Sequence, residues 1–221
     1  MPEIKLEHVT KRWGKFYAVE DLDLTIEDNA FVTLLGPSGC GKTTTLRMIA
    51  GLETPTSGKI TIGDKVVFDS DMGINVPANK RKVGFLFQNY ALWPNMTVYQ
   101  NMKYYAKLSG GCDKRKIEET LQRMGLTDRK NMRFAKLSLG LKQKAVLAQA
   151  ILSSPDLLLL DEPTNGLDTD AKDAFKKVVL EEVQRGCTVV VVSHDHTFVE
   201  QEVDGLFHME NGVLTAKAVQ M

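Results

Sequence analysis

The sequence predicts an α/β fold with a mainly parallel sheet, an N-terminal antiparallel β subdomain and an inserted α-helical subdomain. Continuous apolar runs at 31–35, 157–160 and 187–193 are typical of strands that are covered on both faces. Helical segments separate these runs, which favours parallel pairing. By contrast, the first 30 residues alternate between apolar and polar, which predicts half-exposed strands.

In the first half of the chain, alternation at residues 4–7 and 22–26 predicts two such strands. The apolar run at 31–35 then leads through a glycine-rich loop into a helix that contains residues 46–50. Alternation returns from residue 57 to 68, with Gly63-Asp64 as the expected hairpin turn. A further short strand is expected at 82–87.

In the second half, residues 96–136 show helical periodicity with many Lys, Arg and Met residues. We expect a buried strand at 157–160, a helix at 168–184, a buried strand at 187–193 and a hairpin turn at Asn211-Gly212. The chain is therefore interpreted as a single domain over 1–221. In this interpretation 1–88 and 137–221 form the core and the β subdomain, and 89–136 form the helical subdomain.

Composition excludes several classes of protein. The 28 Lys and Arg residues equal the 28 Asp and Glu residues, so no nucleic-acid partner is expected. The chain has three cysteines, Cys40, Cys112 and Cys187, and no two of them form a C-x-x-C pair. This suits a protein of a reducing compartment, and it predicts no zinc site. The apolar runs are far shorter than the roughly 20 residues that span a bilayer, and no signal-peptide pattern opens the chain.

A glycine-rich loop at 36–43 fits the pattern G-x-x-x-x-G-K-[ST]. Its residues are Gly36, Pro37, Ser38, Gly39, Cys40, Gly41, Lys42 and Thr43. Backbone N–H groups of such a loop surround phosphates, Lys42 bridges them and the Thr43 hydroxyl holds Mg²⁺. A structural glycine turn is the alternative, but it would not need this position between a buried strand and a helix.

Two carboxylates, Asp161 and Glu162, follow the leucine strand at 157–160. Side chains at this end of a parallel strand emerge at the edge of the sheet where ligands bind. There Asp161 can hold the water shell of Mg²⁺, and Glu162 can polarise an attacking water. The alternative is a solvated strand end, which the phosphate-binding pattern upstream makes the weaker interpretation.

Five further motifs occur in a fixed order around these two. They are Lys11-Arg-Trp-Gly14, Phe87-Gln88, Leu137-Ser-Leu-Gly-Leu141, Asn165-Gly-Leu-Asp168 and Val192-Ser-His194. Each has an ordinary explanation alone: Trp13 as core, Gln88 as a solvated strand end, His194 as a hydrogen-bonded residue. In this order, however, they resemble the nucleotide-binding subunit of an ATP-binding cassette (ABC) transporter, which is a P-loop NTPase with a RecA-like core.

The resemblance implies ATP and Mg²⁺ as cofactors and ATP hydrolysis as the activity. It also implies roles for individual residues. Trp13 would stack on adenine, Thr44 would join the phosphate-binding residues, Gln88 would touch Mg²⁺ and the attacking water, and His194 would contact the γ-phosphate. Ser138, Gly140 and Asp168 would bind nucleotide as parts of the signature and the D-loop, with Glu162 as the general base.

The resemblance also implies partners. A second copy of the chain, or a homologous subunit, would face it head to tail, with each ATP between one phosphate loop and the other signature. A transmembrane permease would dock in a groove near Gln88 to Gln100 that includes Tyr90 and Met96. The chain would then lie peripherally at the cytoplasmic face of the cell membrane.

Some residues depart from the family pattern. The signature reads LSLGL rather than LSGGQ, with Leu139 and Leu141 as the changes. Lys144 and Gln149 stand where importer ATPases usually carry arginines, and residues 138–143 with 161–168 are similar to drug and peptide exporter ATPases. The N-terminal half, by contrast, is similar to sugar and polyamine importer ATPases. We expect no C-terminal regulatory domain of the importer type. Two alternatives stay open: an ABC ATPase without a transport role, and a slow regulatory ATP-binding module.

Overall fold

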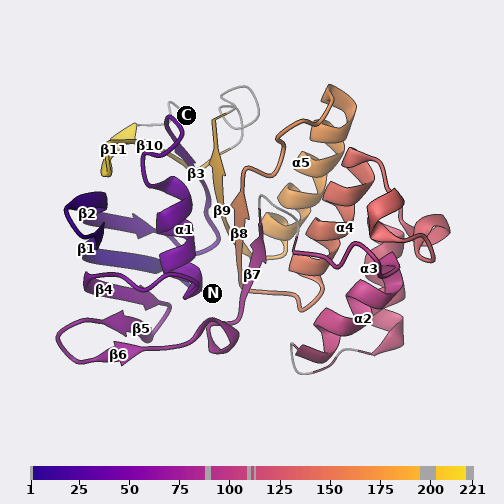
Figure 1. Cartoon of the computed structure of the whole chain (residues 1–221), viewed down its shortest axis with the longest axis horizontal. Helices are drawn as coiled ribbons and strands as arrows, with labels where there is room; N and C mark the ends of the chain where they lie inside the picture. Colours follow the sequence, from indigo (N-terminus) through magenta and orange to yellow (C-terminus); the bar gives the residue numbers. More distant parts are fainter. Residues whose placement is uncertain (1, 88–90, 109–110, 112, 195–202, 218–221) are drawn as a thin grey trace.

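The computed structural model describes residues 2–87, 91–108, 111, 113–194 and 203–217. In these residues, two sheets and five α-helices form three regions (Figure 1). An antiparallel sheet lies at one end of the molecule, a mainly parallel sheet in the middle, and most of the helices at the other end. This agrees with the predicted α/β fold with an antiparallel β subdomain.

The antiparallel sheet has the strand order β2-β1-β4-β5-β6. Its strands are β1 (Ile4–Trp13), β2 (Phe16–Ile26), β4 (Ser57–Ile62), β5 (Lys65–Asp69) and β6 (Ile74–Asn75). In β1 and β2 the apolar side chains that alternate with polar ones are the buried ones. The alternation in the sequence therefore marks one face of this sheet as core.

The second sheet has the strand order β11-β10-β3-β9-β8-β7. Its strands are β3 (Phe31–Leu35), β7 (Val83–Leu86), β8 (Leu157–Asp161), β9 (Thr188–Ser193), β10 (Gly205–Glu210) and β11 (Val213–Lys217). All neighbours pair in parallel except β10 and β11, which form an antiparallel hairpin. The carboxyl ends of β3, β9 and β8 therefore meet at one edge.

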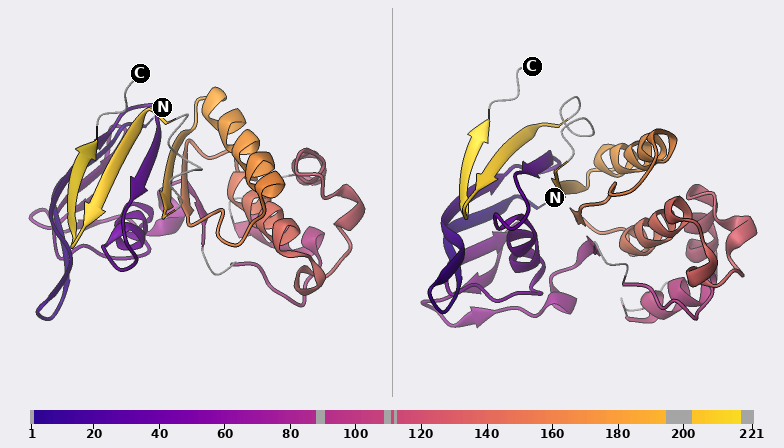
Figure 2. Two further views of the ribbon diagram at one scale, coloured as in Figure 1. Left: turned by 90° about the horizontal axis from the view of Figure 1, so that it is seen from above. Right: turned by 45° about the horizontal axis from the view of Figure 1, so that its top comes forward.

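The helices cover both faces of this sheet. They are α1 (Lys42–Ala50), α2 (Val98–Leu108), α3 (Lys114–Arg123), α4 (Leu139–Ile151) and α5 (Thr169–Gln184), and short 3₁₀ turns occupy Ala78–Lys80, Thr127–Arg129 and Phe134–Lys136. Helix α1 lies between the two sheets, whereas α4 and α5 lie on the opposite side of the parallel sheet (Figure 2).

Two hydrophobic cores result from this arrangement. In β3, Val32 and Leu34 pack into the core that contains α1 and the antiparallel sheet, while Phe31 and Leu35 pack into the core of α2 to α5. The same alternation divides the valines of β9 and the leucines of β8. Strands with a core on each side read as continuous apolar runs, which explains the pattern that predicted them.

Several details differ from the expected elements. Strand β10 pairs in parallel with β3, and β6 adds an edge strand, although no local pattern indicated either pairing. In its described residues, the region from 96 to 136 holds two α-helices and two 3₁₀ turns, and Gly125 at φ +66° follows the end of α3. Among the described residues, no helix is both long and apolar enough to cross a membrane.

Candidate functional site

The phosphate loop, residues 36–44, leaves the carboxyl end of β3 and enters α1. Close packing fixes its backbone at two glycines that have positive φ angles, +152° at Gly36 and +108° at Gly41. A Cβ on Gly36 would lie 2.0 Å from the carbonyl oxygen of Met209, and one on Gly41 would lie 2.3 Å from that of Ala18. Neither position has room for a side chain, because β10 and β2 hold the loop from both sides.

Lys42 is the first residue of α1, and its buried side chain turns back into the phosphate loop. Its Nζ donates to the carbonyl oxygens of Gly36 at 2.6 Å and Pro37 at 2.8 Å. The Cys40 Sγ atom lies 3.6 Å away. Within the described part of the chain, no side chain caps the N-terminus of α1, and no acidic residue occupies its first turn. The loop therefore combines an ammonium group with the positive end of a helix, which favours an anion.

Thr43 joins the phosphate loop to β8. Its hydroxyl donates to Asp161 Oδ1 at 2.8 Å, whereas Asp161 Oδ2 is buried without a hydrogen-bond partner among the described residues. Burial raises the pKa of the Asp161 carboxyl, and the hydrogen bond from Thr43 partly opposes this. A hydroxyl and a carboxylate are the oxygen donors that Mg²⁺ prefers, and a cation would neutralise the orphaned carboxylate oxygen. These residues therefore fit a magnesium ion.

Glu162 follows at the end of β8 and contacts His194 at the end of β9. Its backbone has φ +49°, and its N–H donates to the carbonyl of Val192 at 2.9 Å. This turn places Glu162 Oε2 at 2.7 Å from Nδ1 of His194 and 3.4 Å from its backbone N–H. A left-handed conformation is costly for glutamate, so the close pairing with His194 accompanies local backbone strain.

Trp13 lies where the β1–β2 hairpin turns. Its side chain is 50% exposed, so the alternative that Trp13 is a core residue is wrong. The ring lies parallel to that of Phe16, with 6.3 Å between the ring centroids. Sequence reasoning did not single out Phe16, and the cross-strand pairing of the two aromatic residues would have been the signal.

The signature residues form the N-terminus of α4. Ser138 caps the helix by accepting a hydrogen bond from the backbone N–H of Leu141 at 3.5 Å. Leu139 is exposed, and its Cδ2 would lie 3.0 Å from a Cβ on Gly166. In the described part of the chain, neither Ser138 nor Gly140 forms a hydrogen bond with residues 36–44. The structure therefore does not bring these two predicted residues to the phosphate loop of the same chain.

Asp168 and Gln143 connect α4 and α5 with the turn that follows Glu162. The Asp168 carboxylate accepts from the backbone N–H of Ala171 at 2.8 Å and so caps α5. The buried Gln143 side chain donates to the carbonyl of Pro163. Sequence reasoning missed Gln143, because nothing in a helical pattern indicates that a glutamine points inward to a distant carbonyl.

Gln88, which is predicted to bind Mg²⁺, and Tyr90, which is predicted to line the permease groove, lie outside the described residues. Strand β7 ends at Leu86, at the same edge of the sheet as Asp161. Beyond the gap, Trp93 contacts Tyr104 edge to face, and Tyr104 contacts Tyr105 in the same way. Trp93 and Tyr104 are exposed, so an aromatic surface lies on α2 and the segment before it.

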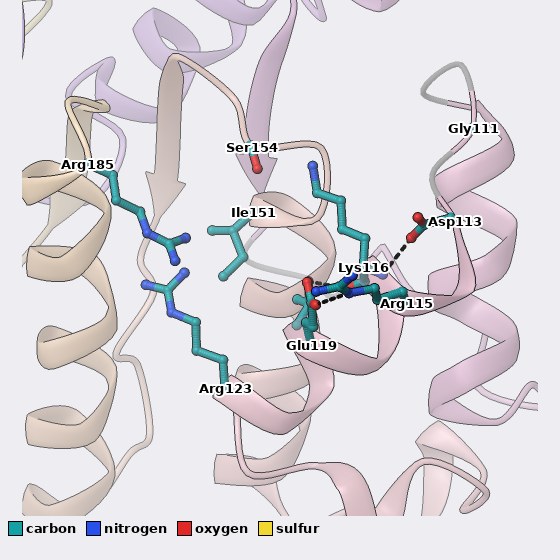
Figure 3. Close-up of a pocket in the computed structure, with 10 residues that line it drawn as sticks. Gly111, Asp113, Arg115, Lys116, Glu119, Arg123, Ile151, Ser154 and Arg185 are labelled. Carbon is teal, nitrogen blue, oxygen red and sulfur yellow. Dashed lines mark hydrogen bonds and ion pairs between the residues drawn. The ribbon is translucent and has the colours of Figure 1, made fainter.

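A cavity of about 630 Å³ lies between α3, α4 and α5, remote from these residues (Figure 3). Arg123 and Arg185 face each other across it, yet both are ion-paired with Glu182. Arg115 is likewise paired with Glu119 at 2.7 Å. Its three arginines are thus ion-paired within the chain, and none of the predicted site residues lines the cavity, so it is not the candidate site.

Comparison with known proteins agrees with this geometry. A protein-family model described as "ABC transporter" matches residues 19–165. The trehalose/maltose import ATP-binding protein MalK of Thermococcus litoralis is 41% identical over 97% of the chain and 59% of its own length. The Fe(3+) ions import ATP-binding protein FbpC of Brucella abortus is 42% identical over 97% of the chain and 60% of its own length. The chain thus spans about 60% of these curated relatives.

Solved structures show the same fold over nearly the whole chain. A dimeric structure of MJ0796, described as a bacterial ABC transporter cassette, has a TM-score of 0.87 at 28% identity and covers 99% of both chains. A second dimeric structure of MJ0796, bound to ADP and Pi, has a TM-score of 0.86 at 28% identity, again over 99% of both chains. By its family model, its relatives and its fold, the chain belongs to the ABC transporter family.

Proposed function

We propose that the chain binds ATP with Mg²⁺ and hydrolyses it as the ATP-driven subunit of a membrane transporter. One observation carries the proposal: the hydrogen bond from Thr43 to Asp161 joins the phosphate loop to the two carboxylates at the end of β8. A nucleotide in the loop would therefore place its terminal phosphate beside Glu162. The family relationship and the structures of related cassettes support the same assignment.

The phosphate loop would bind the β- and γ-phosphates. Lys42 would exchange its two carbonyl partners for phosphate oxygens, since a charged acceptor forms the stronger hydrogen bond. Backbone N–H groups at the N-terminus of α1 would add further donors. Thr43 and Asp161, together with Gln88, would hold Mg²⁺, which supplies charge neutralisation on the phosphates when bound.

Glu162 would act as the general base. Its carboxylate would accept a proton from the water that attacks the γ-phosphorus, and the phosphorus–oxygen bond to ADP would break to release phosphate. His194 contacts this carboxylate and would orient it while reaching the γ-phosphate itself. Because the transition state demands little covalent chemistry from the protein, catalysis would rest on positioning and charge stabilisation.

Hydrolysis would require two chains arranged head to tail. Ser138 and Gly140 at the N-terminus of α4 would close the site on a partner's phosphate loop, with Asp168 nearby. In the described residues, neither Ser138 nor Gly140 is hydrogen-bonded to the loop of its own chain. The dimeric arrangement of a related cassette supports this. The permease would be a separate chain, docked on the aromatic surface after Gln88, and would hold the subunit at the inner face of the membrane.

We favour import over export, because both relatives reported above are named as import proteins. A slow regulatory ATP-binding module is the second candidate, and the observation that favours it is Leu139. Its exposed side chain lies on the surface that would face the partner's nucleotide. A steady-state ATPase rate of the chain, with and without its permease, distinguishes the two candidates.

The decisive experiment is Glu162→Gln. This substitution keeps the shape of the side chain but removes the base, so we expect retained ATP binding, a loss of turnover of about 100-fold or more, and an ATP-dependent dimer. Light scattering after size-exclusion chromatography would detect the dimer. Asp64→Asn, at the exposed β4–β5 turn, is the matched control and should behave like the unmodified protein. Full turnover in Glu162→Gln would remove Glu162 from the role of base.

A further inference from the structure

We propose that Phe16 and Trp13 together form a two-ring platform that selects purine over pyrimidine nucleotides. This rests on the proposed binding of ATP, and it adds Phe16 as a residue that determines base specificity. The expected role of Trp13 alone, stacking on adenine, does not distinguish a large base from a small one. The ring of Phe16, placed parallel to that of Trp13, would let the site discriminate between purine and pyrimidine bases.

The two rings are held together by the hairpin. Trp13 is the last residue of β1, Phe16 is the first of β2, and they are paired across the strands. Gly14 at φ +61° permits the two-residue turn between them. The ring planes are inclined by only 6°, with centroids 6.3 Å apart, so the faces are nearly parallel. The two rings therefore offer a flat ligand one common orientation for stacking.

Both rings are unusually open to solvent. Trp13 is 50% exposed and Phe16 is 60% exposed. Aromatic side chains of this size are mostly buried when they serve only the core, so an exposed parallel pair indicates a surface for a planar apolar partner.

The hairpin is tied rigidly to the phosphate loop. Ala18, two residues after Phe16, has its carbonyl against Gly41, where a Cβ would approach to 2.3 Å. The N–H of Glu20 donates to the carbonyl of Gly212, and the N–H of Gly212 donates to that of Cys40, both at 3.1 Å. A base attached to phosphates in the loop would therefore meet the rings at a fixed position.

Lys11 fixes one face of Trp13. Its Nζ lies 5.4 Å from the ring centroid and is held by Glu53 at 2.6 Å and by the carbonyl of Thr54 at 2.8 Å. The Lys11 side chain is only 11% exposed. Such a cation is attracted to the π face, so this face of Trp13 is already occupied. A base must use the remaining surface of Trp13 together with Phe16.

Base size then decides the affinity. The two fused rings of a purine have enough area to cover parts of both side chains, whereas the single ring of a pyrimidine covers mainly one. Stacking of a base on an aromatic side chain contributes enough free energy that removing one ring is expected to weaken ATP binding by about tenfold. CTP should lose much less, so the preference for ATP over CTP should fall.

The test uses equilibrium titrations of the full chain with ATP, CTP and inorganic tripolyphosphate. For Phe16→Ala we expect the ATP-to-CTP preference to fall by about fivefold to tenfold, with tripolyphosphate affinity unchanged. Phe16→Tyr should restore the preference, because it restores a ring. Tyr17→Ala is the matched control: Tyr17 is 41% exposed but adjacent in β2, and successive side chains of a strand point to opposite faces.

Three results would overturn the inference. The first is an unchanged ATP-to-CTP preference in Phe16→Ala while Trp13→Ala reduces ATP affinity, which leaves the proposed function intact. The second is a parallel loss of tripolyphosphate affinity in Phe16→Ala, which assigns Phe16 a role in folding the loop. The third is failure of the unmodified chain to bind ATP or tripolyphosphate at all, which overturns the proposed function as well.

Discussion

The phosphate loop and the signature end of α4 are built in opposite ways. The loop is enclosed: Gly36 and Gly41 meet backbone carbonyls, and Lys42 is buried. The signature end is open: Leu139 is exposed, and Ser138 forms a 3.5 Å capping bond. A preformed loop can bind phosphates within one chain, whereas an open helix end can act only on something outside it. Substitutions in the two regions should therefore separate ATP binding from hydrolysis.

Lys42→Ala should have the largest effect. It removes the only side-chain cation that the structure places inside the phosphate loop, among the described residues, so ATP affinity should fall by about 100-fold, or about 3 kcal/mol. Isothermal titration of the isolated chain measures this loss. Lys65→Ala, at an exposed position of β5, is the control and should retain full affinity. Affinity within threefold of the unmodified chain would show that backbone donors alone hold the phosphates.

Ser138→Ala should have a smaller effect, and it should reduce ATP hydrolysis rather than ATP binding. Losing the helix cap costs about 1 kcal/mol of stability or less, because the bond it removes is long. ATP affinity of the monomer should not change, while the ATPase rate at high protein concentration should fall by about tenfold, since in the proposed dimer the hydroxyl would act on the partner's nucleotide. Binding by titration and turnover by phosphate release, on the same preparation, separate the two quantities.

The control for Ser138→Ala is Ser138→Thr, which keeps both the cap and the hydroxyl. It should retain most of the turnover. If Ser138→Ala weakened monomer binding as strongly as turnover, the division between the enclosed loop and the open helix end would be wrong. The signature would then contribute to the site of its own chain.

The same contrast explains what the sequence could predict. The buried strands and the phosphate loop were predictable, because a continuous apolar run and a glycine pattern are local signals at 31–43. The carbonyl of Met209 against Gly36 was not, because it depends on the parallel pairing of β10 with β3, some 170 residues apart in sequence. The family resemblance implies nucleotide contacts for Ser138 and Asp168, and the structure shows that both also cap helices. Capping and anion binding favour the same residue types, so the sequence does not separate the two roles.

Gly166→Ala should have the smallest effect, a modest loss of stability, and it directly compares the packing of the signature end with that of the phosphate loop. Alanine at φ +74° costs about 1 kcal/mol, and its Cβ would also approach Leu139 Cδ2 to 3.0 Å. Because Leu139 is exposed and flexible, it can move, so a double-mutant cycle with Leu139→Ala in urea unfolding should give a coupling below about 0.5 kcal/mol. Gly41→Ala is the counterpart in the loop, where the obstacle is the Ala18 carbonyl and no side-chain change relieves it. A large coupling between residues 139 and 166 would mean that the signature end is held as firmly as the loop, and that the altered signature is a fixed part of the site.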